Sequence, residues 1–222
     1  MNVLLLNASP HREASHGYRL AREAVDVLRY RETAAGREFL LIERDLVAAP
    51  LPPVGSIYAK AVTSRDTDSA AFALSETLIG EIEAADCLLI NTPMHNFTVP
   101  AALKLWIDYV LRINRTFRST PEGKVGLMRD RPSFVIVGSG GVHSGPNARQ
   151  ADFLTPYLRY ALGSIGLHDL RFFLLQGLVM GDAVVQAELA RERAALRRCV
   201  PFCAAPPAEA ARPASLGEAT DA

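Results

Sequence analysis

The stretch that most constrains the fold lies near the middle of the chain, at residues 87–118. It opens with CLLIN, an uncharged run that suits a strand buried on both faces between layers of helices. The run ends at Thr92-Pro93, because proline has no N–H to donate and disfavours helix in the residue before it. Apolar residues then recur on one helix face up to Asn114, with Thr98 as the expected N-cap and Pro100 in the first turn. This order of strand, loop and helix predicts one unit of a parallel α/β sheet.

The loop between this strand and this helix carries residues that suit a flat heteroaromatic ligand. Open α/β sheets bind ligands at the loops that leave the carboxyl ends of their central strands. Met94 and Phe97 offer polarizable apolar contact, and Asn96 offers amide donors and an acceptor. A tight loop with buried anchors explains the four residues Met94, His95, Asn96 and Phe97 equally well.

A second candidate ligand loop follows the apolar run at residues 2–6. A helix is expected to begin near Ser15, and its first turn offers free N–H groups and partial positive charge. The hydroxyls of Ser9 and Ser15 and the steric freedom of Gly17 would complete a seat for a phosphate group. The alternative is plain capping by Ser15 and a simple turn at Ser9.

A third candidate loop, GSGGVH, follows the predicted strand at residues 133–137. Its glycines permit unusual backbone angles and a close approach of N–H groups to a ligand. His143 could donate a hydrogen bond to a ligand oxygen, although a loop histidine is more often solvated or bonded to backbone. The loop lacks the spacing of a dinucleotide-binding fingerprint, so its motif alone identifies no ligand.

The remaining segments complete an α/β pattern. Further strands are expected at 38–44 and 171–175, and helices at 70–84, 154–165 and 183–198. Residues 45–68 show no periodicity, and residues 117–132 carry the glycines and proline of a hairpin. Five strands alternating with five helices predict a doubly wound, five-stranded parallel sheet in flavodoxin-like order, with helices on both faces. We expect one domain over residues 1–203 and a disordered tail over 204–222.

Composition narrows the classes of partner and compartment. Lysine plus arginine and aspartate plus glutamate both number 24, which gives no charge that favours nucleic acid or acidic membranes. The apolar opening is too short for a signal peptide, and no run reaches the ~18 residues of a spanning helix. The three cysteines, Cys87, Cys199 and Cys203, form neither a disulfide framework nor a zinc site. A cytoplasmic protein with free thiols is therefore expected.

Taken together, the motifs resemble those of the FMN-dependent NADH:azoreductase and quinone reductase family. The likeness spans about residues 1–200, from LLLNASP through DLVAAPLP and TPMHNFTVPAALKLWIDYVLRINRTFR to GSGGVH and TPYLRYALGSIGLHDLRF. It implies FMN as cofactor and NADH or NADPH as electron donor. The residues implied in FMN binding are Ser9, Ser15, His16 and Gly17 around the phosphate, Pro93, Met94, His95, Asn96 and Phe97 beside the ring, and Gly138, Ser139, Gly140, Gly141 and His143 at its pyrimidine end.

Three positions depart from the family pattern. His95 stands where the family usually has tyrosine, and Gly138-Ser139 stands where it usually has serine-arginine. His16 replaces a small or polar residue. The loss of the arginine should alter the mouth of the site, so the substrate preference of the family cannot be copied to this chain.

The leading hypothesis for function is a two-electron, ping-pong reduction of quinones or azo compounds through FMN. The hydride chemistry belongs to the cofactor, so no acid-base side chain is obligatory, and Asn96 and His143 are the candidates for assistance. The alternatives are a flavodoxin-like carrier that hands single electrons to protein partners, and a flavin-free relative.

A homodimer is expected from apolar residues that the predicted elements leave uncovered. Leu105 and Tyr109 lie off the main helix stripe, and Phe117 precedes a polar excursion. In a dimer, Phe117 and the 45–68 loop would wall the substrate pocket of the neighbouring chain. Alternatively, Leu105 and Tyr109 pack beneath loops of their own chain.

Overall fold

A parallel sheet of five strands forms the centre of the molecule, in the order β2-β1-β3-β6-β7. The computed structural model describes residues 1–64 and 70–202. Both the doubly wound α/β class and the flavodoxin-like strand order predicted from the sequence are confirmed. The strands are β1 (Asn2–Asn7), β2 (Leu40–Asp45), β3 (Cys87–Pro93), β6 (Ser133–Gly138) and β7 (Leu170–Leu175).

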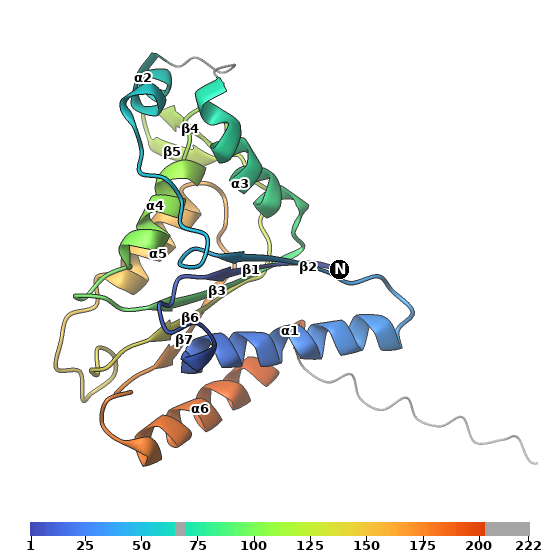
Figure 1. Cartoon of the computed structure of the whole chain (residues 1–222), viewed down its shortest axis with the longest axis vertical. Coiled ribbons are helices and arrows are strands. Elements are labelled where there is room, and N and C mark those ends of the chain that lie inside the picture. Colours follow the sequence, from blue (N-terminus) through green and yellow to red (C-terminus); the bar gives the residue numbers. More distant parts are fainter. Residues whose placement is uncertain (65–69, 203–222) are drawn as a thin grey trace, which may run out of the picture.

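Helices cover both faces of the sheet (Figure 1). One face carries α1 (His16–Ala34) and α6 (Asp182–Arg197). The other carries α3 (Ala73–Ala84), α4 (Ala101–Val110) and α5 (Leu154–Gly163). The three central strands are therefore buried on both sides, which explains why β1, β3 and β6 read as nearly continuous apolar runs.

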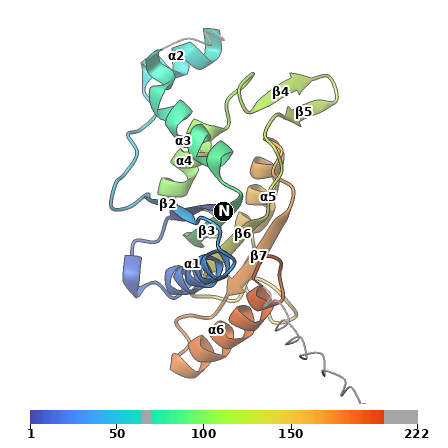
Figure 2. The ribbon, with the colours of Figure 1, turned by 90° about the vertical axis from the view of Figure 1, so that its right-hand side faces the viewer.

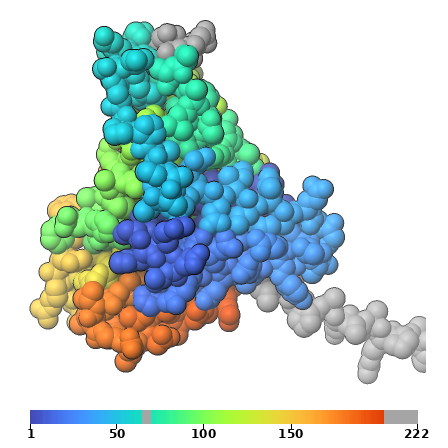
Figure 3. Space-filling view, in the orientation of Figure 1, coloured from blue at the N-terminus to red at the C-terminus, as the bar shows by residue number. Residues whose placement is uncertain are grey.

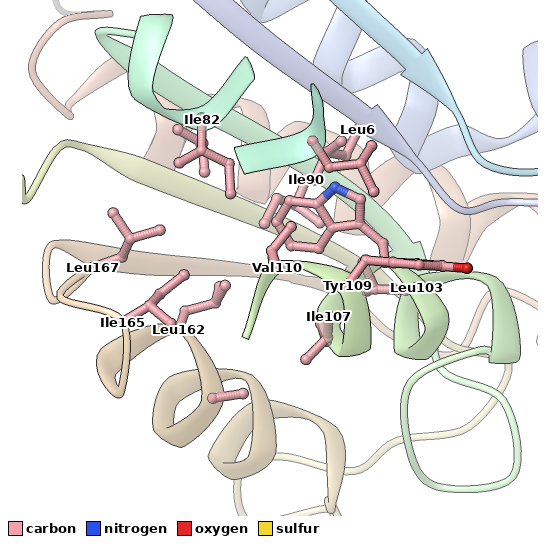
Figure 4. Close-up of a cluster of buried hydrophobic side chains, with 14 of the residues drawn as sticks. Leu6, Ile82, Ile90, Leu103, Ile107, Tyr109, Val110, Leu162, Ile165 and Leu167 are labelled. Atoms are coloured by element: carbon pink, nitrogen blue, oxygen red, sulfur yellow. The ribbon is translucent and has the colours of Figure 1, made fainter. Parts of the chain in front are cut away.

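The larger of the two apolar cores lies between the sheet and α3, α4 and α5 (Figure 4). Trp106 of α4 is fully buried there, against side chains from strands and helices. Leu103, Ile107 and Val110 share its helix face, as the spacing of the sequence predicts. This burial fixes α4, and with it the loop that joins β3 to α4.

The start of α4 differs from the sequence-based prediction. Thr98 does not cap the helix, because its N–H and its carbonyl both pair with His95 in a tight turn. Pro100 takes the N-cap position, without a side-chain hydrogen bond. The helix also ends at Val110, so Asn114, which has a φ of 61°, lies beyond it.

The prediction that residues 45–68 lack regular structure is wrong for their second half, where α2 spans Ser56–Ser64. Only Tyr58 and Ala61 of this helix are buried, so its sequence shows little periodicity. The predicted hairpin is confirmed as β4 (Phe117–Thr120) and β5 (Gly123–Gly126). Figure 2 shows α2 and the hairpin extending beyond the same end of the molecule. Residues 65–69 lie outside the described structure.

The apolar surface expected at Tyr109 and Phe117 is covered within the chain. Tyr109 donates a hydrogen bond from its hydroxyl to the Pro52 carbonyl (2.9 Å), and its ring packs edge-on against Tyr58, with 5.0 Å between centroids. Phe117 is buried, and the Lys124 ammonium lies 4.6 Å from its ring centroid. The alternative of packing beneath local loops is therefore correct for Tyr109, and these side chains give no reason for a dimer.

Other boundaries shift by a few residues. Two 3-10 helices, η1 (Arg12–Ala14) and η2 (Ala70–Phe72), precede α1 and α3, so the helix expected from residue 70 starts in a tighter form. The described residues form six α-helices rather than five. None of these helices is long and apolar enough to cross a membrane. The predicted tail, together with Cys203, lies outside the described residues.

Candidate functional site

Three loops meet at the carboxyl edge of the sheet, after the adjacent strands β1, β3 and β6. Together they line a cavity of about 370 Å³. Figure 3 shows the first of these loops, in dark blue, at the surface between the cyan and orange parts of the chain. Ten of the predicted site residues line the cavity: Ser9, Ser15, His16, Gly17, Pro93, Met94, His95, Gly138, Ser139 and Gly140.

Four predicted site residues lie beside the cavity rather than in its lining. Asn96 and Phe97 are exposed at the tip of the second loop, and Gly141 and His143 lie further along the third. Phe117 lies in the hairpin and does not line the cavity of its own chain. Six lining residues were not predicted from the sequence: His11, Ala14, Asn91, Thr92, Leu178 and Val179.

The first loop presents the start of α1 to the cavity. Ser15 caps this helix by accepting a hydrogen bond from the Tyr18 amide to its Oγ (3.3 Å), as predicted. The amides of His16 and Gly17 lie in the first turn, where a helix has no carbonyl partners for its N–H groups. Burial, together with the positive charge of Arg19, lowers the pKa of His16. This turn thus offers hydrogen-bond donors and partial positive charge to an anion.

A chain of buried amides fixes the first loop to the second. Asn91 donates from Nδ2 to Asn7 Oδ1 (2.8 Å), and Asn7 donates in turn to Asp45 Oδ2 (3.2 Å). Burial opposes ionisation of Asp45, but hydrogen bonds from Ala48, Val47 and Asn7 outweigh it and lower the pKa of the carboxyl. The sequence signal for these hydrogen bonds was the presence of an asparagine in each of two otherwise apolar strands. Which groups the asparagines bond to becomes visible only once the strands are paired in the structure.

The second loop is a tight turn from His95 to Thr98. The His95 amide donates to the Thr98 carbonyl (2.9 Å) and the Thr98 amide to the His95 carbonyl (3.0 Å). The two central residues have positive φ, 47° for Asn96 and 74° for Phe97, which costs a bulky residue conformational energy. The Phe97 carbonyl accepts from the Phe153 amide (3.0 Å), which helps to hold this conformation.

The third loop combines open amides with an ordered polar cluster. In the described part of the chain, no hydrogen bond uses the amides of Gly140 and Gly141. Ser139 Oγ donates to the Gly141 carbonyl and lies 3.0 Å from His143 Nδ1. The Gln176 side chain accepts from the His143 amide (2.9 Å) and so ties the loop to the segment after β7.

Gln150, which sequence reasoning missed, contacts two loops of the site without lining the cavity. Its Nε2 lies 3.5 Å from Met94 Sδ, and a Cβ on Gly141 would come within 2.6 Å of its Oε1. Gln150 therefore bridges the second and third loops. No motif marks it, because its segment has no regular structure of its own.

The cavity lining carries no carboxylate, lysine or arginine. Its polar groups are hydroxyls, backbone amides, asparagine and three histidines, two at the first loop and His95 in the second, and Met94, Leu178 and Val179 add apolar surface. The described residues also hold no group of three or more histidine, cysteine, aspartate or glutamate side chains that could bind a metal. The arrangement suits a flat ligand with an anionic end at α1.

The buried His143 should make the stability of the protein fall as the pH falls. Burial lowers the pKa of His143 from its ordinary value of 6.5, although Asp152 and the Gly141 carbonyl act in the opposite direction. The unfolded chain therefore takes up this proton at a higher pH than the folded chain does. The stabilisation is complete above about pH 6.5 and is lost as the pH falls below it. Melting temperatures at several pH values should decline less steeply in His143→Gln, and equal slopes in the two proteins would contradict this assignment.

Comparison with known proteins agrees with the fold. A family model described as a flavodoxin-like fold matches residues 1–200. The chain is 60% identical over 196 residues to FMN-dependent NADH:quinone oxidoreductase 4 of Pseudomonas fluorescens, covering 88% of this chain and 93% of that protein. It is 51% identical over 187 residues to FMN-dependent NADH:quinone oxidoreductase 5 of Burkholderia lata, covering 84% and 90%.

A solved structure shares the same architecture. The azoreductase from Bacillus anthracis str. Sterne superposes with a TM-score of 0.72 at 25% sequence identity, covering 90% of this chain and all of that one. Together with the matched family model, this shows that the chain belongs to the flavodoxin-like family.

Proposed function

We propose that the protein is an FMN-dependent NAD(P)H oxidoreductase that reduces quinones, azo compounds or both. One observation carries the proposal: the first turn of α1, with its free N–H groups, and the glycine loop, with the unbonded amide of Gly140, line the same cavity. A phosphate with a flat ring attached needs this combination. The relatives with 60% and 51% identity are named for the same activity.

The residues of the cavity fit FMN. Its phosphate would sit at Ser9, Ser15, His16 and Gly17, where first-turn amides and a hydroxyl are available. Its ring would lie beside Pro93, Met94 and His95, with the tip residues Asn96 and Phe97 at its edge. The open amides of Gly140 and Gly141 would serve the pyrimidine end.

FMN, when bound, supplies the hydride chemistry. The protein has to bind the cofactor, exclude water and stabilise charge. The open amides of the third loop would stabilise negative charge on the pyrimidine end of a bound flavin by donating hydrogen bonds, without moving a proton. NADH or NADPH and the electron acceptor would use one site in turn, since no dinucleotide fingerprint occurs in the sequence.

An electron carrier with protein partners is the second candidate that the sequence leaves open, and the names of the relatives do not favour it. The two functions differ in what they require of NADH. The proposed enzyme should oxidise NADH with a quinone in a reaction that depends on added FMN. A protein that binds FMN but shows no NADH-dependent turnover would instead support the carrier.

Asn96→Ala should weaken FMN binding by roughly 1 to 3 kcal/mol, since the flavin edge would lose an amide partner. Alanine also tolerates the φ of 47° poorly, so the variant would disturb the turn as well as the contact. Asn96→Gly is the matched control, because glycine keeps the backbone and removes only the amide. The affinity for FMN, measured by fluorescence titration, should fall in both variants, and an unchanged affinity in Asn96→Gly would remove Asn96 from the site.

The proposal keeps a homodimer in which the 45–68 segment helps to wall the neighbour's substrate pocket, whereas Phe117, which is buried in its own chain, is not available for that role. Exposed apolar side chains support an interface: Val125 and Leu127 on the hairpin segment, and Phe153 and Tyr160 at α5. Turnover should therefore fall together with assembly on dilution. Sedimentation and activity over one dilution series test this, and a fully active monomer would refute the shared site.

A cytoplasmic location and a lack of nucleic-acid or membrane partners also belong to the proposal. They rest on the balanced charge and on the sparse cysteines of the sequence. Cys87 is buried as a free thiol, and burial raises its pKa to about 12, which makes it unreactive.

A further inference from the structure

A groove far from the cavity lies where α1 and α6 end. It has a volume of about 870 Å³ and is lined by Val27, Tyr30, Arg31, Ala34, Ala35, Arg37, Arg197 and Phe202. The two helices lie on the same face of the sheet (Figure 1), and a hydrogen bond from Arg193 Nε to Glu23 Oε2 (2.6 Å) joins them. Because a helix rises about 1.5 Å per residue, Arg31 lies roughly 20 Å along α1 from His16 at the cavity.

The α1 side of the groove is an apolar stripe outside the core. Val27, Tyr30 and Ala34 recur at helical spacing, and none of them belongs to the core cluster on this face of the sheet. The Tyr30 side chain is 76% exposed. Phe202 adds apolar surface from the segment after α6, and its ring is anchored edge-on against Phe134, with 4.7 Å between centroids. An aromatic ring can therefore lie against Tyr30 in this groove.

Two arginines of the groove have no anionic partner. In the described part of the chain, the guanidinium of Arg31 makes no hydrogen bond or ion pair, and its Nη1 is buried. The same holds for the ion pairs of Arg197, whereas Arg37 is bonded to Glu32 (Nε to Oε2, 2.9 Å). No carboxylate lines the groove. A partly buried cation without a counter-charge is unfavourable, so an anion that reaches Arg31 would offset this cost.

The size and the polarity of the groove suit a small aromatic acid. Sites for small molecules have volumes of about 300–1,000 Å³, and the groove falls in this range. A guanidinium binds a planar carboxylate through two parallel hydrogen bonds, and the apolar walls favour a ligand whose remaining surface is apolar. The alternative is that Arg31 and Arg197 serve only to offset the partial negative charge at the last turns of their helices.

We propose that this groove is a second binding site of the protein, which takes a small aromatic carboxylate. The ring lies against Tyr30, and the carboxylate binds Arg31 and Arg197. The groove shares no lining residue with the cavity, so this ligand and FMN do not compete. The site does not depend on the proposed function.

Isothermal titration calorimetry with 2-naphthoate tests the site, on the full chain saturated with FMN so that the cavity is filled. We expect saturable binding of one naphthoate per chain. The amide 2-naphthamide has the same rings without the charge and should bind at least roughly tenfold more weakly. No saturable binding, or equal affinities for the two compounds, would overturn the proposal. A protein that takes up no FMN would contradict the proposed function alone, since the same titration without FMN still tests the groove.

Variants of the groove locate the bound naphthoate. Arg31→Met and Arg197→Met keep much of the apolar stem, and each should weaken naphthoate binding roughly tenfold. Neither should lower the melting temperature, because neither arginine has an anionic partner to lose. Tyr30→Ala should weaken binding roughly threefold to tenfold. Arg29→Met is the matched control, since Arg29 is bonded to Asp26 (3.0 Å) and does not line the groove. An unchanged affinity in either groove arginine variant would overturn the proposal.

The chain after Phe202 is the other possible occupant of the groove, because it carries the acidic residues Glu209, Glu218 and Asp221. If these residues occupied the groove, their neutralisation in the full chain would free it for naphthoate. We expect the affinity for naphthoate to be the same in the wild type and in a variant with Glu209→Gln, Glu218→Gln and Asp221→Asn. Binding that appears or strengthens tenfold only in this variant would show that the chain fills its own groove, and would overturn the proposal.

Discussion

Gly17→Ala is expected to abolish ligand binding at the cavity and to lower the free energy of unfolding by about 1 to 3 kcal/mol. A Cβ at this position would lie 2.3 Å from Asn91 Oδ1 and 3.3 Å from Ile136 Cγ2. Asn91 cannot easily retreat, because it is buried in β3 and its Nδ2 is bonded to Asn7. The helix would have to move away from the strand, and the first-turn amides would move with it.

A glycine in α3 provides the control for this variant. Gly80 has no atom within 4 Å of its added Cβ, and its helix does not line the cavity. Gly80→Ala should therefore be neutral or stabilising by about 0.5 to 1 kcal/mol, as is usual inside a helix. Thermal unfolding and FMN titration of both variants give the comparison. Equal affinities for FMN in the two variants would show that the contact between α1 and β3 does not shape the site.

Arg131→Met should cost about 2 to 4 kcal/mol of stability and leave FMN binding intact in the folded fraction. The Arg131 guanidinium is buried and donates to the carbonyls of Ile82, Ala85 (2.8 Å) and Arg129 (Nη2, 2.9 Å). These bonds tie the end of α3 to the segment that leads into β6. Methionine fills much of the same space but leaves the buried carbonyls without donors.

Arg129→Met is the matched control, since the Arg129 side chain is 71% exposed and lies 3.6 Å from Asp86. An exposed pair of this kind contributes at most about 1 kcal/mol. Denaturant unfolding should therefore separate the two methionine variants clearly. If Arg131→Met were as stable as Arg129→Met, the buried guanidinium would not hold these segments together. If Arg131→Met lost affinity for FMN at denaturant concentrations below its unfolding transition, the amino end of β6 would influence the site.

The positions of the three ligand loops could be predicted from the sequence because they depend on local rules. An uncharged run followed by Thr92-Pro93 gives a buried strand and its end, and Ser15 gives a helix start. Strand order then places the loops at one edge. The contacts that shape the cavity needed the structure, since Asn91 meets Gly17 and Gln150 meets Met94 only across separate elements.

The errors have a common physical origin in tertiary burial. Helix α2 has only two buried residues, so its sequence carried no periodic signal. Tyr109 was assigned to an uncovered surface because a helix stripe cannot show that Tyr58 and Pro52 would pack over it. Thr98 has the chemistry of an N-cap, but the turn with His95 uses both of its backbone groups.

The central claim is that the cavity beside α1 holds FMN and passes electrons from NADH to an acceptor. The absorption spectrum of the purified protein with one equivalent of FMN, recorded without oxygen during addition of NADH and then of a quinone, tests this claim directly. We predict a bound-flavin spectrum that bleaches with NADH alone and returns when the quinone is added. A protein that takes up no FMN, or a bound flavin that NADH does not bleach, would contradict it.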